Sequence, residues 1–225
     1  MGRIGVIASS GGSSFDAAQG LLARMNRTDF VGVVVDRPCG FEQVAARHGL
    51  PCQAVPYTDA ESFSARALGL LRDQGADGCL LYYTRRVTAP LIGAIPVWNV
   101  HLSLLPAFAG IGSAKKMAAA GVRVAGATLH VAEQTMDSGP ILAQTVSPVP
   151  VGAVEQDLLH IGFAHNVYLT LWAGEMARLN LLHQRSAPEG LPISPSACPA
   201  LPDRALAESF MQWMLVNCPT VTFHG

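Results

Sequence analysis

The chain has 225 residues, of which 50% are hydrophobic and 14% charged. A chain of this length and composition can bury a sizeable hydrophobic core, and we expect one domain followed by a tail. Its 15 basic and 16 acidic residues leave a formal net charge of -1, so the sequence shows no electrostatic footprint of nucleic-acid binding, and a small molecule is the expected partner. No apolar run approaches the length of a membrane span, and the N-terminus carries neither a signal-peptide pattern nor a myristoylation motif. We therefore expect a cytoplasmic protein that binds neither nucleic acid nor a membrane.

The number and spacing of the cysteines also favour a cytoplasmic protein. They are five in number, far apart and without C-x-x-C spacing, which argues against a disulfide framework and against a zinc site. We expect reduced thiols at all five positions, which are Cys39, Cys52, Cys79, Cys198 and Cys218.

Short β-branched or apolar segments alternate with segments of helical period along the chain, as a parallel sheet with crossover helices requires. The predicted strands are residues 4–8, 31–35, 53–55, 78–83 and 97–100, and the predicted helices are residues 14–25, 41–48, 59–74 and 154–179. The repetition of this unit predicts an α/β fold with a doubly wound, mostly parallel sheet.

The first predicted strand ends in a run of serine and glycine, residues 9–14, that leads directly into the first helix. Backbone N–H groups and a helix N-terminus converge there, which is the arrangement of an anion site. The alternative is an ordinary Gly-Ser turn in which Ser13 or Ser14 caps the helix.

The segment WNVHLSLLP, residues 98–106, carries the most informative pattern. If residues 97–101 form a strand, alternation places the side chains of Asn99 and His101 on one face. An amide can donate to an oxygen that gains negative charge, and an imidazole can move a proton near neutral pH. Acyl transfer to an amine needs both functions, whereas the alternative is a pair that only satisfies a loop.

Two further segments add candidate polar groups. Residues 127–132, ATLHVA, form a predicted strand with His130 between apolar neighbours, a position that a satisfied core histidine also occupies. Asp137 precedes a Ser-Gly-Pro turn and a further apolar segment, residues 141–149. A carboxylate held by such a turn orients an imidazole or a water, unless it only bonds its own backbone.

Together these segments resemble the folate-dependent formyltransferases, and within them the members that act on glycinamide ribonucleotide. The family's N-x-H-x-S-L-L-P signature is present from Asn99 to Pro106, and its D-x-G-P-I signature from Asp137 to Ile141. A G-x-T-x-H segment ending at His130 precedes the second signature. The resemblance covers roughly residues 1–174 and implies a Rossmann-like formyltransferase fold, a purine-biosynthesis setting and no metal.

The resemblance also implies roles for three side chains. Asn99 would polarise the formyl group and stabilise the tetrahedral oxyanion, His101 would donate or shuttle a proton, and Asp137 would hold His101 and a water.

The implied formyl donor is 10-formyltetrahydrofolate. Thr84 to Pro90 corresponds to a family segment whose arginine, here Arg86, meets the glutamate tail of the folate and whose backbone meets the pteridine. The expected donor-site residues are Arg86, Val87, Thr88, Glu133 and Met136.

The expected acceptor is a small-molecule amine, and its site departs from the family pattern. The expected acceptor-site residues are Gly11, Gly12, Ser13, Ser14 and His130. Ser14 stands where the family has asparagine, and Ala164 where it has the glutamate that binds the ribonucleotide. The acceptor is therefore either glycinamide ribonucleotide or an amino sugar or modified amino acid of specialised metabolism, and hydrolysis of the donor is a further alternative.

Lys115 and Lys116, the only two lysines, either begin a solvated helix or meet an anionic substrate.

The C-terminal part lies outside the resemblance. We expect a catalytic domain over residues 1–184 and a tail over residues 185–225, in which a Pro- and Ser-rich linker leads to an amphipathic helix. The apolar face of this helix carries Leu206, Phe210, Trp213 and Met214. It either packs on its own chain, forms a homodimer contact or covers the active site.

Overall fold

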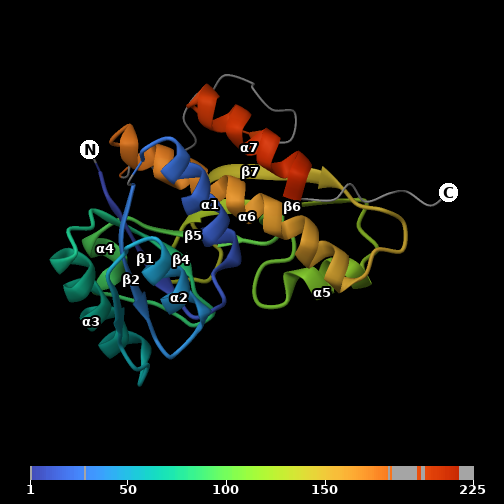
Figure 1. The fold of residues 1–225 in the computed structure, drawn as a ribbon. Coiled ribbons are helices and arrows are strands. Elements are labelled where there is room, and N and C mark those ends of the chain that lie inside the picture. The colour runs from blue at the N-terminus through green and yellow to red at the C-terminus, as the bar shows by residue number, and fades with distance from the viewer. Residues whose placement is uncertain (1, 28, 182, 184–196, 199–200, 218–225) are drawn as a thin grey trace.

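The computed structural model describes every residue except 1, 28, 182, 184–196, 199–200 and 218–225. Strands and helices alternate from the N-terminus (Figure 1). The strands are β1 (Ile4–Ala8), β2 (Phe30–Val35), β3 (Cys52–Ala54), β4 (Gly78–Tyr82), β5 (Val97–His101), β6 (Val124–Val131), β7 (Ile141–Pro148) and β8 (Ala197–Cys198). The helices are α1 (Ser13–Arg24), α2 (Gly40–Arg47), α3 (Ala60–Asp73), α4 (Leu91–Ala94), α5 (Ser113–Ala119), α6 (Glu155–Arg178) and α7 (Arg204–Asn217).

The strands form one eight-stranded sheet in the order β3-β2-β1-β4-β5-β6-β7-β8. All pairings from β3 to β5 are parallel, whereas β6, β7 and β8 add in antiparallel fashion. The chain order reverses between β1 and β4, so their carboxyl ends flank the crevice in which open α/β sheets bind ligands. The predicted doubly wound, mostly parallel α/β sheet is therefore confirmed.

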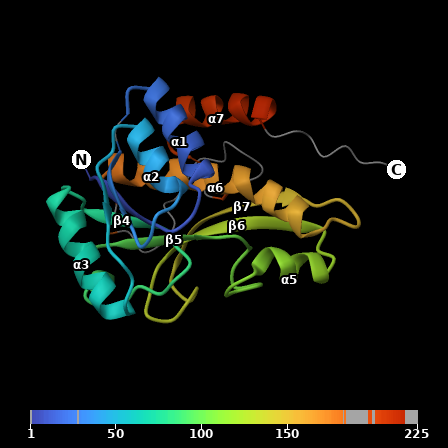
Figure 2. The same ribbon diagram turned by 60° about the horizontal axis from the view of Figure 1, so that its bottom comes forward.

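Two apolar layers cover the faces of the sheet. The larger one buries side chains of α1, α2, α6 and α7 against residues such as Ile4, Leu80 and Trp98, and Figure 2 shows these four helices on one side of the strands. The other layer packs α3 and α4 against Ile7 and Val97. Because consecutive side chains of a strand point to opposite faces, Trp98 lies in the first layer and Val97 in the second.

The predicted elements agree with the structure within a few residues. Helix α3 begins where Asp59 accepts a 2.8 Å hydrogen bond from the Ser62 N–H, as an N-cap should. The structure adds α4 and β8, and it begins β6 at Val124, three residues before the predicted strand. Helix α5 contains Lys115 and Lys116, so the expectation that they lie at the start of a helix is confirmed.

The apolar face of the C-terminal helix packs on its own chain. Helix α7 contacts α1 and α6, and its Leu206 and Phe210 are buried there. The Tyr168 hydroxyl accepts a 2.7 Å hydrogen bond from the Leu201 N–H, which fixes the entry to the helix. The expected linker lies largely outside the described residues, and the homodimer contact stays a prediction.

Three cysteines, Cys39, Cys52 and Cys79, are free thiols, as expected. The side chains of Cys198 and Cys218 lie outside the described part of the chain. Within that part, no helix is both long enough and apolar enough to cross a membrane.

Candidate active site

A cavity of about 280 Å³ lies beside the carboxyl ends of β4 and β5. Three chain segments close it: residues 83–87 after β4, residues 110–113 at the start of α5 and residues 132–137 after β6. Eight of the predicted site residues line this cavity, namely Arg86, Val87, Asn99, His101, His130, Glu133, Met136 and Asp137. Segments far apart in sequence therefore meet at one site.

Asn99 and His130 face each other across the antiparallel β5–β6 pair. His130 Nδ1 lies 2.9 Å from the Val131 carbonyl oxygen, which only accepts hydrogen bonds, so Nδ1 carries the proton. His130 Nε2 then accepts a 3.2 Å hydrogen bond from the Asn99 amide nitrogen. Burial lowers the pKa of His130, which keeps it neutral for this role. His130 thus orients the Asn99 amide and leaves its second N–H available to a ligand.

His101 lies between two acceptors. Its Nε2 is 3.0 Å from the Phe108 carbonyl oxygen, and its Nδ1 is 3.3 Å from Asp137 Oδ2. The imidazole ring is thus held beside Asn99 with an oxygen acceptor next to each of its nitrogens.

Asp137 lies beside both histidines. Its Oδ2 accepts a 2.7 Å hydrogen bond from the Gly110 N–H, and its Oδ1 is 3.6 Å from His130 Nε2. The residue has a positive φ of 54°, which is uncommon without glycine and is typical of sites where function fixes the backbone. Gly139 makes the turn possible, because a Cβ there would lie 1.9 Å from the Val131 carbonyl oxygen.

The loop that follows β5 is anchored by a buried polar group. The Thr128 hydroxyl donates to the Ser103 carbonyl oxygen at 2.7 Å and accepts from the Leu105 N–H at 3.0 Å. The Gln144 amide donates to the Thr128 hydroxyl and to the Leu105 carbonyl oxygen. These bonds fix the turn that carries the chain from His101 to Phe108.

The expected donor-site residues divide into two groups. Arg86, Val87, Glu133 and Met136 line the cavity, and Arg86 donates to the Gln134 carbonyl oxygen at 3.2 Å. The structure places Thr88 away from the cavity wall, because its N–H donates to the Ser64 hydroxyl on α3. Arg86 thereby connects the segments after β4 and β6.

The expected acceptor loop, Gly11 to Ser14, lies outside the walls of this cavity. Gly12 has a positive φ of 76°, and a Cβ there would meet the Phe41 ring. A hydrogen bond of 3.2 Å between the hydroxyls of Ser9 and Thr84 connects the start of the loop to the cavity wall. Neither Ser13 nor Ser14 makes a side-chain cap, since α1 has none.

Several groups in and near the cavity were not among the predicted site residues. Tyr83 stacks on Phe63, while Arg85 lies 3.2 Å from the buried carboxylate of Asp36 and over the Tyr57 ring. The Gly110 N–H and the Phe108 carbonyl are backbone groups, so the residue types at these positions do not predict their contacts with Asp137 and His101. The sequence signal available for the loop was Gly110 itself, a glycine four residues after the end of the signature, which the structure places at a φ of 81°.

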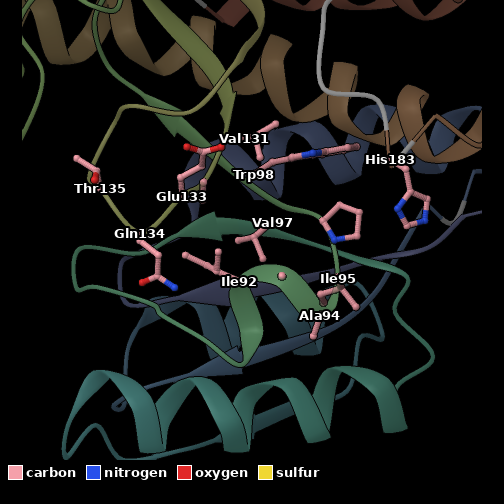
Figure 3. A pocket seen from close by; sticks show the side chains of 13 residues that line it. Ile92, Ala94, Ile95, Val97, Trp98, Val131, Glu133, Gln134, Thr135 and His183 are labelled. Atoms are coloured by element: carbon pink, nitrogen blue, oxygen red, sulfur yellow. The ribbon is translucent and has the colours of Figure 1, made fainter.

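A second cavity of about 500 Å³ lies on the other side of the segment after β6. Figure 3 shows it surrounded by side chains of α4, of the start of β5 and of residues 133–135, with His183 at its edge. Ala132, Glu133 and Gln134 line both cavities, so this segment forms the wall between them. The second cavity contains none of the predicted catalytic side chains.

In the part of the chain that the structure describes, no group of three or more histidine, cysteine or acidic residues is arranged to hold a metal ion. The polar side chains that line the first cavity include the Asn99 amide, the His101 and His130 imidazoles and the Asp137 carboxylate. Such a set can stabilise an oxyanion and transfer a proton.

Comparison with known proteins gives consistent matches. A family model described as formyl transferase matches residues 2–161. The chain is 32% identical over 169 residues to a chloroplastic phosphoribosylglycinamide formyltransferase of Vigna unguiculata, covering 69% of this chain and 54% of that protein. The chain thus spans about half the length of this relative.

Two solved structures show the same fold. A glycinamide ribonucleotide transformylase from Symbiobacterium toebii superposes with a TM-score of 0.73 at 30% identity, over 83% of this chain and 92% of that one. A formyltetrahydrofolate deformylase from Pseudomonas syringae pv. tomato superposes with a TM-score of 0.70 at 24% identity, over 83% of this chain and 65% of that one. At this lower identity the second match shows the fold alone.

Proposed function

Because the chain belongs to the formyl transferase family, whose formyl donor is 10-formyltetrahydrofolate, we propose that it transfers the formyl group of this folate to the amine of a small-molecule acceptor. The observation that carries the proposal is the convergence of Asn99, His101, His130 and Asp137 on one cavity. A protein that only binds a ligand has no need of this set.

The first step is attack of the unprotonated acceptor amine on the formyl carbon. The carbonyl oxygen gains negative charge, and the second N–H of Asn99 donates to it. His130 holds the Asn99 amide in this orientation through its Nε2, so the donor is in place before the reaction begins. The neighbouring His101 imidazolium adds positive charge at the same position.

The second step expels tetrahydrofolate, whose departing nitrogen must receive a proton. His101 supplies it, and the proton that the attacking amine loses returns to His101 through the Asp137 carboxylate or a water held there. Both His101 nitrogens have protein acceptors in the structure, so one contact opens during turnover. The Phe108 contact is the one that opens, because Asp137 must stay close to return the proton.

The side chains that line the cavity support a folate donor. Ile111 and Met136 at its walls are 78% and 49% exposed, and they offer apolar surface to a planar ring. Arg86 and Arg85 place positive charge beside the same cavity, where the glutamate tail of a folate is anionic.

The acceptor is the open part of the proposal. Glycinamide ribonucleotide is one candidate, and it is favoured by the similarity to the phosphoribosylglycinamide formyltransferase and the glycinamide ribonucleotide transformylase described above. An amino sugar or modified amino acid is the other, because Ala164 on α6 has no polar group and Ser14 is buried. Hydrolysis of the donor, with water in place of the amine, is the alternative reaction, and the fold is shared with a deformylase.

The test is release of tetrahydrofolate from 10-formyltetrahydrofolate by the purified protein. It is run with glycinamide ribonucleotide, with a panel of amino sugars and amino acids, and without acceptor. Release that depends on an amine supports the transferase, and the amine identifies the acceptor. Equal release without acceptor would replace transfer by hydrolysis, and no release under any condition would refute the proposal.

A further inference from the structure

Three side chains hold three backbone groups of the loop between β5 and α5. His101 Nε2 lies 3.0 Å from the Phe108 carbonyl oxygen, Lys116 Nζ donates to the Ala109 carbonyl oxygen at 2.8 Å, and Asp137 accepts from the Gly110 N–H at 2.7 Å. His101 and Asp137 belong to the proposed catalytic set, whereas Lys116 is on α5, outside the cavity wall.

The contacts of Lys116 and Asp137 are with the two ends of one peptide unit. The Ala109 carbonyl and the Gly110 N–H belong to the same peptide, so a cation holds its negative end and an anion its positive end. Each contact polarises the peptide and strengthens the other. The pair therefore selects one orientation of this peptide.

These two contacts are needed because the backbone of the loop does not by itself select the orientation of the peptide between Ala109 and Gly110. Gly110 has a φ of 81°, and a glycine reaches positive and negative φ with similar ease. Phe108 also has a positive φ, 56°, where a bulky side chain is strained. If the peptide turned over, Asp137 would lose the Gly110 N–H and His101 would lose a fixed position for the Phe108 carbonyl.

We propose that Lys116 is a positioning residue for His101 and Asp137, acting through the peptide between Ala109 and Gly110. This inference rests on the proposed function for its kinetic consequence, but its structural consequence does not depend on it. A lysine that is only solvated, or that attracts an anionic substrate by its charge, would act differently.

Lys115 provides the matched control. It is on the same helix, carries the same charge and has no hydrogen bond with the loop among those the structure gives. We compare Lys116→Met, which keeps most of the stem, with Lys115→Met and with Lys116→Arg, which restores a donor. We expect Lys116→Met to lower kcat about five- to twenty-fold, as loss of one charge-assisted hydrogen bond does, with KM for the folate within about twofold. Lys115→Met should match the wild type, and Lys116→Arg should recover most of kcat.

A second readout measures the Gly110 amide by hydrogen exchange, which needs no activity. Its exchange should become about tenfold faster in Lys116→Met and stay unchanged in Lys115→Met, because only the former loosens the peptide. Equal kinetic losses in both methionine variants, or unchanged Gly110 exchange in Lys116→Met, would overturn the proposal. If the wild type transfers no formyl group, the proposed function fails, and the exchange measurement still decides the role of Lys116.

Discussion

The Asn99 side chain carries the proposed oxyanion contact, and its removal is the sharpest test of the site. Asn99→Ala should lower kcat about a hundred- to a thousand-fold, the usual loss when one oxyanion donor is removed. Steady-state kinetics, with the acceptor that the tetrahydrofolate-release assay selects, measures the effect. Folate affinity, measured by equilibrium binding, should change little, because the lost N–H serves the transition state more than the ground state.

Unchanged kcat in a folded Asn99→Ala protein would remove Asn99 from the mechanism. A large loss of folate affinity with unchanged kcat would instead make it a binding residue. The loss of the amide also leaves His130 Nε2 without its donor, so thermal unfolding is compared in parallel.

At the scale of single residues, the sequence predicts side chains better than backbone groups. The two-residue period of a strand predicted that Asn99 and His101 share a face, and the family resemblance implied that Asp137 joins them. The structure brings all three side chains to one cavity. The Phe108 carbonyl and the Gly110 N–H were not predictable, because every residue has such groups. Their position depends on a loop that Thr128 anchors from a distant strand.

At the scale of elements, the shortest helix was the one that the sequence did not predict. Helix α6 has 24 residues, whereas α4 has four and includes Gly93 at a non-helical backbone conformation. A segment of four residues is too short to show a helical period, so α4 was missed. The start of β6 was missed for another reason, since Val124 lies at an exposed end where no alternation marks the boundary.

Helix α6 also makes the stability depend on pH through His165. This side chain is buried against β7, and its Nδ1 lies 2.6 Å from the hydroxyl oxygen of Thr145. The same Thr145 hydroxyl donates a hydrogen bond to the Ala127 carbonyl oxygen. Burial lowers the pKa of His165 to about 4. The unfolded chain, with an ordinary histidine pKa near 6.5, therefore binds a proton before the folded chain does.

The free energy of unfolding should consequently fall as the pH drops from about 6.5 toward 4, by about 1 to 3 kcal/mol for this group. His165→Asn keeps a donor near Thr145 and removes the titration. Urea unfolding at pH 7 and pH 4.5 should show a smaller loss for the variant than for the wild type. Equal losses in both proteins would mean that His165 is not the group responsible.

At the scale of the whole molecule, the packing of α7 predicts that the tail unfolds together with the rest of the core. Phe210 of α7 is buried, with its ring 5.0 Å from Tyr168 and 5.9 Å from Trp213 between ring centroids. Asp203, which precedes the helix, lies 3.7 Å from Arg27 in a network that includes the buried Glu175. These contacts unite the predicted tail with the predicted catalytic domain.

Phe210→Ala should therefore destabilise the whole protein by about 3 to 5 kcal/mol, the cost of deleting a buried aromatic ring. Met211→Ala is the matched control on the next residue, which is 37% exposed, and it should cost less than about 1 kcal/mol. Hydrogen exchange resolved along the chain measures both effects. If α7 folds with the core, Phe210→Ala lowers the protection of β1 and β4 together with that of α7, because all three open in the same global unfolding. If only α7 loses protection, the predicted boundary at residue 184 separates two folding units, and the contacts of Phe210 stabilise the tail without supporting the sheet that carries the site.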